Sequence, residues 1–156
     1  IHKVLEEILV LEKDTITRKN GRFEQIYDPS LPPIEADEDQ LKQVFLNLIK
    51  NAIEASRKGG KVEIITRVGS GYAVKTALSP VPQQHIVVEI IDSGIGMDEE
   101  AQKKLFTPFH TTKQKGSGLG LSISLKIVED HHGKIKVTSE KDLGTTVQVF
   151  LPIRKR

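Results

Sequence analysis

The chain has 156 residues and a mass of 17.4 kDa, the size of one domain with a core of its own. Hydrophobic residues make up 37% and charged residues 28%, which indicates a soluble globular protein, and no apolar run approaches the roughly 20 residues of a membrane helix. The absence of cysteine excludes disulfides and thiolate metal sites, and a net charge of +2 without a basic cluster argues against nucleic-acid binding.

The N-terminal segment predicts a helix followed by strands. Apolar side chains recur at helical spacing over residues 2–13, which read as the end of a helix. Residues 15–27 are rich in β-formers, and Asn20-Gly21 in their midst is a strong turn signal. We therefore expect a β-hairpin over this stretch.

The middle of the chain predicts a long helix and two strands. Asp37 followed by Gln40 resembles a capping box, and the apolar stripe behind it predicts a helix to about residue 58. Residues 61–68 read as a strand. Residues 86–91 are apolar on both sides, which is typical of a strand at the centre of a sheet.

The last third predicts a short acidic helix over 98–105, a loop over 107–118, a helix ending at Gly133, and closing strands over 134–139 and 145–153. Parallel βαβ repetition is missing from this order. We therefore expect an α+β fold, a two-layer α/β sandwich whose mixed, mostly antiparallel sheet carries helices on one face.

Two asparagines form the first candidate site. Asn47 and Asn51 are four residues apart, so they share one face of the predicted helix, at the edge of its apolar stripe. Their amide oxygens can face a cation while the helix body packs on the sheet. The alternative is that both are ordinary boundary residues facing solvent.

Asp92 ends the central strand and forms the second candidate site. It shares the parity of the buried positions Ile86, Val88 and Ile90, so its carboxylate should lean to the buried side and need a donor. An adenine amino group is a suitable donor, and Gly94 and Gly96 would let a flat base approach the backbone. The alternative is a surface aspartate in a glycine turn.

A glycine-rich segment before the last helix forms the third candidate site. Glycines at a helix N-terminus expose backbone N–H groups that favour phosphate, and Lys113 and Lys115 add positive charge just upstream. The segment fits neither the P-loop nor the Rossmann fingerprint. The alternative is a flexible loop leading into a helix. The residues are Gly116, Ser117, Gly118, Leu119 and Gly120.

These segments, taken in order, resemble a known family. Asn47–Ala52, Asp92–Gly96, Phe106–Phe109 and Gly116–Leu121 are similar to the asparagine box, the two glycine boxes and the phenylalanine box of the histidine-kinase catalytic domain. That family shares its ATP-binding Bergerat fold with gyrase B, Hsp90 and MutL. The run from Leu105 to Lys113 looks particularly like the nitrogen-regulation type of sensor kinase.

The resemblance implies roles for individual residues. Asn51 would bind Mg²⁺, Asn47 would lie near the triphosphate, and Asp92 would accept from the adenine amino group beside Thr145. Glu54 and Ala55 stand where many members carry a basic and an aromatic residue, so Lys50 or Lys113 would substitute as the phosphate contact. Asn47 and Lys113 are the residues expected to act in catalysis. The ATP lid, about residues 107–118, and the two residues following it would supply the remaining contacts: Thr112, Lys113, Gly116, Ser117, Gly118, Leu119 and Gly120.

The expected function is transfer of the ATP γ-phosphoryl group to a histidine on a separate domain, in two-component signalling. None of the five histidines matches the acceptor motif, so residues 1–14 would link to a dimerisation and phosphoacceptor domain and 15–156 would form the catalytic domain. We expect a cytoplasmic domain, monomeric alone, from a homodimeric parent that phosphorylates a response regulator. Alternatives are an ATP-hydrolysing clamp, an anti-sigma-type serine kinase and a non-catalytic nucleotide-sensing module.

Overall fold

The computed structural model describes residues 1–70, 83–106 and 120–154. In chain order, the elements of this part are α1 (His2–Arg18), β1 (Arg22–Tyr27), α2 (Glu38–Ala55), β2 (Lys61–Gly69), β3 (His85–Asp92), α3 (Glu99–Lys103), α4 (Gly120–Asp130), β4 (Lys134–Glu140) and β5 (Gly144–Pro152).

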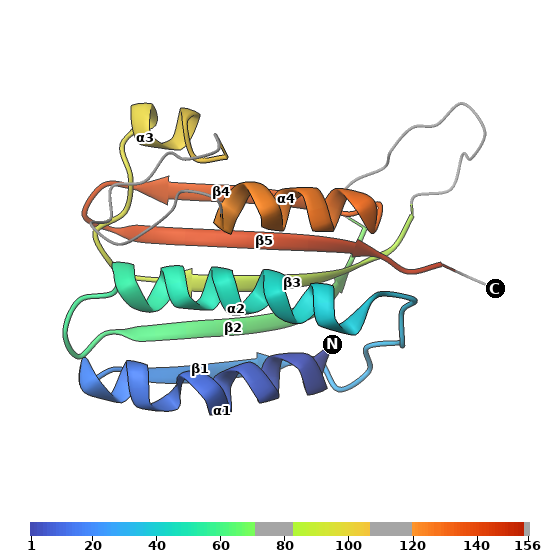
Figure 1. Cartoon of the computed structure of the whole chain (residues 1–156), viewed down its shortest axis with the longest axis horizontal. Helices are drawn as coiled ribbons and strands as arrows, with labels where there is room; N and C mark the ends of the chain where they lie inside the picture. The colour runs from blue at the N-terminus through green and yellow to red at the C-terminus, as the bar shows by residue number, and fades with distance from the viewer. Residues whose placement is uncertain (71–82, 107–119, 155–156) are drawn as a thin grey trace.

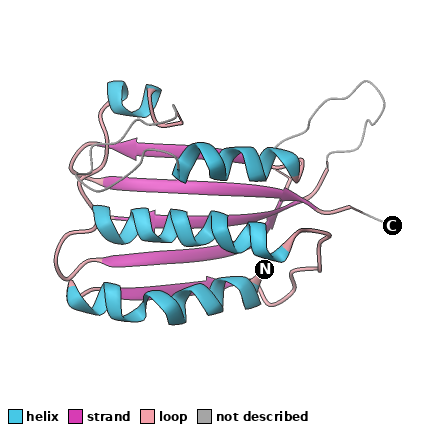
Figure 2. Ribbon diagram, viewed as in Figure 1, coloured by secondary structure: helices cyan, strands magenta, loops and turns pink. Residues whose placement is uncertain are grey.

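The strands form one mixed sheet in the order β1-β2-β3-β5-β4. β1 and β2 are parallel, and every other neighbouring pair is antiparallel. Helices α1, α2 and α4 lie side by side across one face of this sheet, and α3 stands apart near the end of β4 (Figures 1 and 2). The expected α+β sandwich is confirmed, with β3 in the centre of the sheet.

The core lies between the helix layer and the sheet. Phe45 and Leu48 of α2 are at most 1% exposed. They belong to the same hydrophobic cluster as fully buried strand residues such as Ile64 and Ile90. Burying a side chain of this size contributes about 1.5–3 kcal/mol. The apolar stripe of α2 therefore fixes this helix over the middle of the sheet, with one edge left for polar residues.

Both ends of α2 have identifiable caps. The Asp37 side chain accepts a hydrogen bond from the Gln40 N–H at 3.0 Å, as the capping pattern predicts. The helix ends at Ala55, three residues earlier than expected, where the Lys19 ammonium donates to three carbonyl oxygens at 2.9–3.0 Å. A cation at a helix C-terminus is favourable because it satisfies carbonyls and opposes the helix dipole. These carbonyls belong to Ile53, Glu54 and Ser56.

The hairpin expected over residues 15–27 is wrong. Helix α1 continues to Arg18, because Ile16 extends its buried stripe and is only 4% exposed. The Asn20-Gly21 signal ends that helix instead: Asn20 has a φ of +54°, and the Gly21 N–H donates to the Ile16 carbonyl at 3.0 Å. β1 then pairs in parallel with β2 across α2, a βαβ unit that the expected order lacked.

The remaining predicted helices and strands are confirmed to within a few residues, and the loop expected over 107–118 lies outside the described residues. The short acidic helix is α3, whose N-cap Asp98 accepts from the Ala101 N–H at 2.8 Å. β4 and β5 meet at a turn in which Asp142 and Gly144 both have positive φ. Among the described residues, none of the helices combines the length and apolar character that a membrane crossing requires.

Candidate functional site

Asp92 is a buried carboxylate at the end of the central strand. It is 7% exposed and lies on the helix-facing side, as its parity predicts, and its Oδ1 accepts from the Gly94 N–H at 3.0 Å. Burial raises the pKa of this carboxyl above its ordinary value, although the Gly94 and Thr145 backbone N–H groups oppose the rise. A buried acceptor with few donors is suited to a ligand that brings one.

The two glycines after Asp92 let the loop approach protein backbone. A Cβ on Gly94 would lie 2.0 Å from the Ala55 carbonyl oxygen, at the end of α2. Gly96 has a φ of +63°, and its Cβ would lie 1.9 Å from the Glu140 carbonyl oxygen. The space beside these two glycines is therefore filled by α2 and β4. Gly94 and Gly96 can affect a base pocket only by letting the Asp92 loop pack in this position.

Asn47 is held between α2 and the start of α4. Its Nδ2 donates to the Ser124 Oγ at 3.1 Å, and Ser124 is 1% exposed. A Cβ on Gly120 would lie 2.3 Å from the Asn47 Oδ1, so only glycine lets α4 begin this close. Ser124 was missed by the sequence reasoning, although it follows Gly120 by four residues and shares its helix face.

Asn47, Asn51 and Ala55 follow one another at one-turn intervals along a single face of α2, about 6 Å apart. The first contacts the start of α4, and the third contacts the Asp92 loop, where the Ile95 N–H donates to the Ala55 carbonyl at 3.3 Å. Asn51 is half-buried between them. The structure therefore brings the asparagine pair, Gly120 and the Asp92 loop to one side of one helix.

Lys50 and Thr145 complete the described residues expected here. Lys50 lines a hollow of about 240 Å³ beside Asn47, but its ammonium lies 3.8 Å from the buried Glu12 carboxylate of α1. The Thr145 residue of β5 lies directly opposite Asp92 in the strand register. Ser139, whose hydroxyl is 2.7 Å from that of Thr145, was also missed, although it shares the parity of the buried positions of β4.

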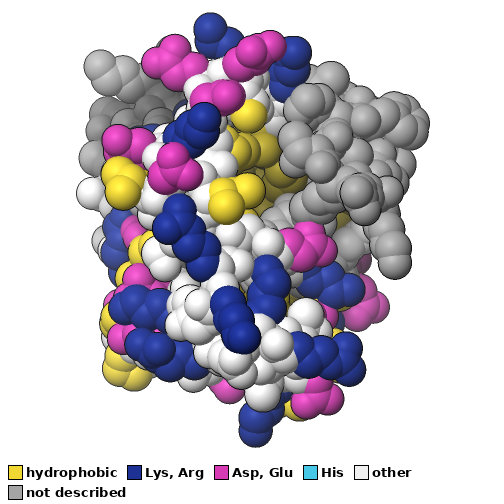
Figure 3. All heavy atoms as spheres, turned by 90° about the vertical axis from the view of Figure 1, so that its left-hand side faces the viewer, with side chains coloured by type: hydrophobic (Ala, Val, Ile, Leu, Met, Phe, Trp, Pro, Cys, Tyr) yellow, Lys and Arg dark blue, Asp and Glu magenta, His cyan; other side chains and the backbone are white. Residues whose placement is uncertain are grey.

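The remaining predicted contacts lie outside the described residues, as does the expected ATP lid: these are Thr112, Lys113, Gly116, Ser117, Gly118 and Leu119. The end of the molecule that carries the Asp92 loop is shown in Figure 3, where acidic and basic side chains are interspersed over the described surface.

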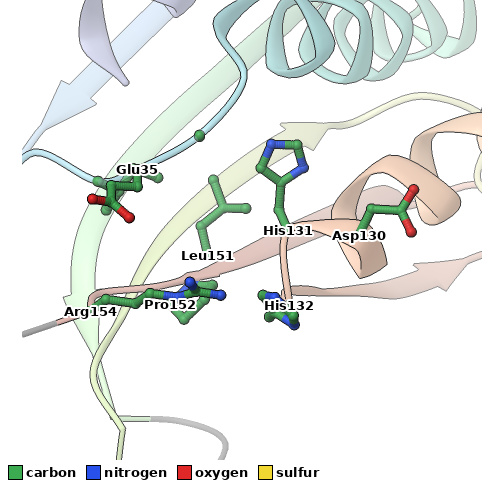
Figure 4. Close-up of a pocket in the computed structure, with 9 residues that line it drawn as sticks. Glu35, Asp130, His131, His132, Leu151, Pro152 and Arg154 are labelled. Carbon is green, nitrogen blue, oxygen red and sulfur yellow. The ribbon is translucent and has the colours of Figure 1, made fainter.

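A second hollow, of about 230 Å³, lies at the other end of α4 (Figure 4). Its most constrained side chain is His131, whose Nδ1 is 2.8 Å from the Ile127 carbonyl and whose Nε2 accepts from the Asp37 N–H at 3.0 Å. The first bond holds the ring against the end of α4, and the second joins it to Asp37, the N-cap of α2. The hollow contains none of the residues expected to bind nucleotide, and we assign it a structural role.

Comparison with known proteins agrees with this arrangement. The family described as "Histidine kinase-, DNA gyrase B-, and HSP90-like ATPase" matches residues 36–155. The sensory histidine kinase/phosphatase NtrB of Azospirillum brasilense is 41% identical over 156 residues, which cover 98% of this chain and 38% of that protein. Sporulation kinase E of Bacillus subtilis is 42% identical over 125 residues, 80% of this chain and 15% of that protein.

Solved structures show the same likeness. The catalytic domain of histidine kinase ThkA matches with a TM-score of 0.79 and 34% identity, covering 97% of this chain and 91% of that one. ThkA in complex with the response regulator protein TrrA matches with a TM-score of 0.74 and 33% identity, covering 97% of this chain and 40% of that one. The chain spans 15% of the length of sporulation kinase E and 38% of the length of the Azospirillum NtrB protein. It belongs to the histidine kinase-, DNA gyrase B- and HSP90-like ATPase family, and within that family it is an ATP-binding catalytic domain of the histidine-kinase type.

Proposed function

We propose that this domain holds Mg-ATP across the side of α2 that carries Asn47 and Asn51 and transfers the γ-phosphoryl group to a histidine on a separate domain. The observation that carries the proposal is the alignment of Asn47, Asn51 and the Asp92 loop along one helix face. In this arrangement Asp92 accepts from the adenine amino group, and the phosphates lie towards Asn47 and the start of α4.

The residues present suit a cation that arrives with the nucleotide. Mg²⁺ takes most of its ligands from water and substrate phosphates and needs only one or two oxygens from the protein. The half-buried Asn51 amide offers such an oxygen one helical turn from Asn47. When bound, Mg²⁺ would neutralise phosphate charge and help align the γ-phosphoryl group.

The amide at position 47 favours transfer over hydrolysis. A carboxylate there could deprotonate an attacking water, whereas an amide cannot act as a base. The Asn47 amide also donates to Ser124 through its nitrogen, which directs its oxygen towards the start of α4. A histidine imidazole needs no such base, because its nitrogen attacks phosphorus directly while the bond to the β-phosphate oxygen breaks and ADP leaves.

The wider setting of the domain is part of the same proposal. Residues 1–14 lead to a dimerising domain with the phosphoacceptor histidine, in a homodimeric parent whose kinase domain lies in the cytoplasm. A response regulator then receives the phosphoryl group. This is supported by the identity with NtrB over nearly the whole chain and by the ThkA structure with its regulator.

Calorimetric titration and phosphate analysis test the proposal. The chain should bind Mg-ATP with slow turnover, and Asn51→Ala should abolish the dependence of affinity on Mg²⁺. The parent protein should incorporate acid-labile, base-stable phosphate from radiolabelled ATP. Brisk ATP hydrolysis by this domain would favour a clamp-type ATPase instead, and acid-stable phosphate on a partner would favour a serine kinase.

A further inference from the structure

Three polar side chains form a row across the end of the sheet. Ser139 of β4 lies opposite Thr145 of β5, and Thr145 lies opposite Asp92 of β3. Directly opposite residues on antiparallel strands project from the same face. That face carries the buried Ile90 and is covered by the helices, so the row points into the site described above.

The hydrogen bonds of Ser139 determine which way its hydroxyl points. The Met97 N–H donates to the Ser139 Oγ at 2.9 Å, and this Oγ donates to the Gly144 carbonyl at 3.1 Å. A serine hydroxyl has one proton; with that proton on the Gly144 carbonyl, the remaining contact, 2.7 Å to the Thr145 Oγ1, uses the threonine proton. Thr145 is therefore the donor in that pair, and its oxygen is left as an acceptor towards Asp92.

A further side chain holds Ser139 in this arrangement. Gln102, next to the last residue of α3, donates through Nε2 to the Met97 carbonyl at 3.1 Å and to the Ser139 carbonyl at 3.0 Å. The backbone on either side of the Ser139 hydroxyl is thus fixed to the same helix. Because the surroundings are part-buried, water is a poor substitute for these partners, and the polarity of the row is set by protein groups.

We propose that Ser139 is a positioning residue for base selection, which acts by holding the Thr145 oxygen as an acceptor beside the Asp92 carboxylate. The inference rests on the proposed nucleotide site. Two adjacent acceptors match the exocyclic amino group of a 6-aminopurine, whose hydrogens they can receive directly or through a shared water. A 6-oxopurine would place its carbonyl oxygen against the Thr145 acceptor, and its rejection follows from that mismatch.

The test compares ADP and GDP affinities by calorimetry for the whole chain and its variants. Ser139→Ala frees the Thr145 proton to turn towards the base, so the ADP-over-GDP preference should fall about tenfold, the value of one hydrogen bond to a mismatched partner. Ser139→Thr keeps a hydroxyl and should restore the preference. Thr138→Ala is the matched control, because Thr138 lies on the same strand, is exposed and faces away from the row.

Each outcome bears on a different step. Equal weakening of ADP and GDP by Ser139→Ala, or failure of Ser139→Thr to restore the preference, would leave only a structural role and overturn the inference. If Ser139→Ala does not fold, Thr145→Val removes the acceptor itself, and an unchanged preference in that variant also overturns it. A wild-type chain that binds neither nucleotide would instead refute the proposed function.

Discussion

Replacing Gly120 with alanine is a direct test of how Asn47 is positioned. The added Cβ would lie 2.3 Å from the Asn47 Oδ1 and 2.8–2.9 Å from the rest of its amide group. Contacts this short cannot be tolerated, so the amide must rotate away and give up its 3.1 Å hydrogen bond to Ser124. Backbone is not involved, and the helix itself has no reason to unfold.

The expected change in stability is small. Losing one hydrogen bond costs about 1 kcal/mol, and alanine in place of glycine returns up to about 1 kcal/mol in helix propensity. The free energy of unfolding in urea should therefore stay within about 1 kcal/mol of wild type. Mg-ATP affinity should fall roughly tenfold to a hundredfold, because a hydrogen bond to a charged group contributes about 1.5–3 kcal/mol.

Two further variants separate the cause from general damage. Ser124→Ala removes the same hydrogen bond without the clash and should weaken Mg-ATP binding in the same direction. Thr66→Val removes another buried hydroxyl, which bonds His2 and the Asp28 N–H in the second half of β2, whereas Asp92 pairs with the start of that strand. This variant should leave Mg-ATP affinity unchanged. A folded Gly120→Ala variant with Mg-ATP affinity within about twofold of wild type would refute the assignment of Asn47 to the phosphates.

Three other perturbations give distinct outcomes. Asp92→Asn should weaken ADP binding about tenfold, and it should also remove a pH-dependent loss of stability. Burial raises the pKa of Asp92 in the folded state above its ordinary value of 3.8. The wild-type fold therefore loses stability as pH rises from near 3.8 through the folded-state pKa. Urea unfolding should show that the free energy of unfolding of the variant increases relative to wild type over that interval. Lys19→Met should lower the free energy of unfolding by about 1.5–3 kcal/mol, because three carbonyls lose a charged donor, and the urea midpoint measures this. Phe45→Ala should cost about 3–5 kcal/mol, which thermal unfolding detects, whereas a loss below about 1 kcal/mol would contradict the described core.

Most of the fold follows from local patterns, and the exception has a specific cause. The stripe of α2, the two-sided apolar run of β3 and the turn before Gly144 each predict their element from spacing alone. Asn20-Gly21 suits both a hairpin turn and a helix end, because both need a residue with positive φ. The burial of Ile16 against the rest of the core decides between them, and that is a tertiary contact no short window contains.

The sequence predicts the candidate site residues themselves but not the side chains that hydrogen-bond to them. Asp92 and the asparagine pair follow from strand parity and helix spacing, and the structure places them where these periods predict. The partners of Asn47 and Thr145 come from segments 77 and 6 residues away, and a lone serine carries no pattern of its own. Gly94 and Gly96 were expected to let a flat base approach the backbone. In the structure they make room for the Ala55 and Glu140 backbones instead.

The C-terminus of α2 connects two parts of the molecule that are distant in sequence. Lys19, just after α1, binds the last carbonyls of α2, and its own carbonyl accepts from the Gly59 N–H at 2.7 Å. On the other side of the same turn, the Ala55 carbonyl accepts from Ile95 in the Asp92 loop. The end of α1 cannot shift relative to α2 without breaking the Lys19 hydrogen bonds to the Glu54 and Ser56 carbonyls. These carbonyls flank Ala55, whose own carbonyl holds the Asp92 loop. A measurement of ADP affinity in Lys19→Met therefore shows whether the end of the site proposed to bind the base depends on the anchoring of α1.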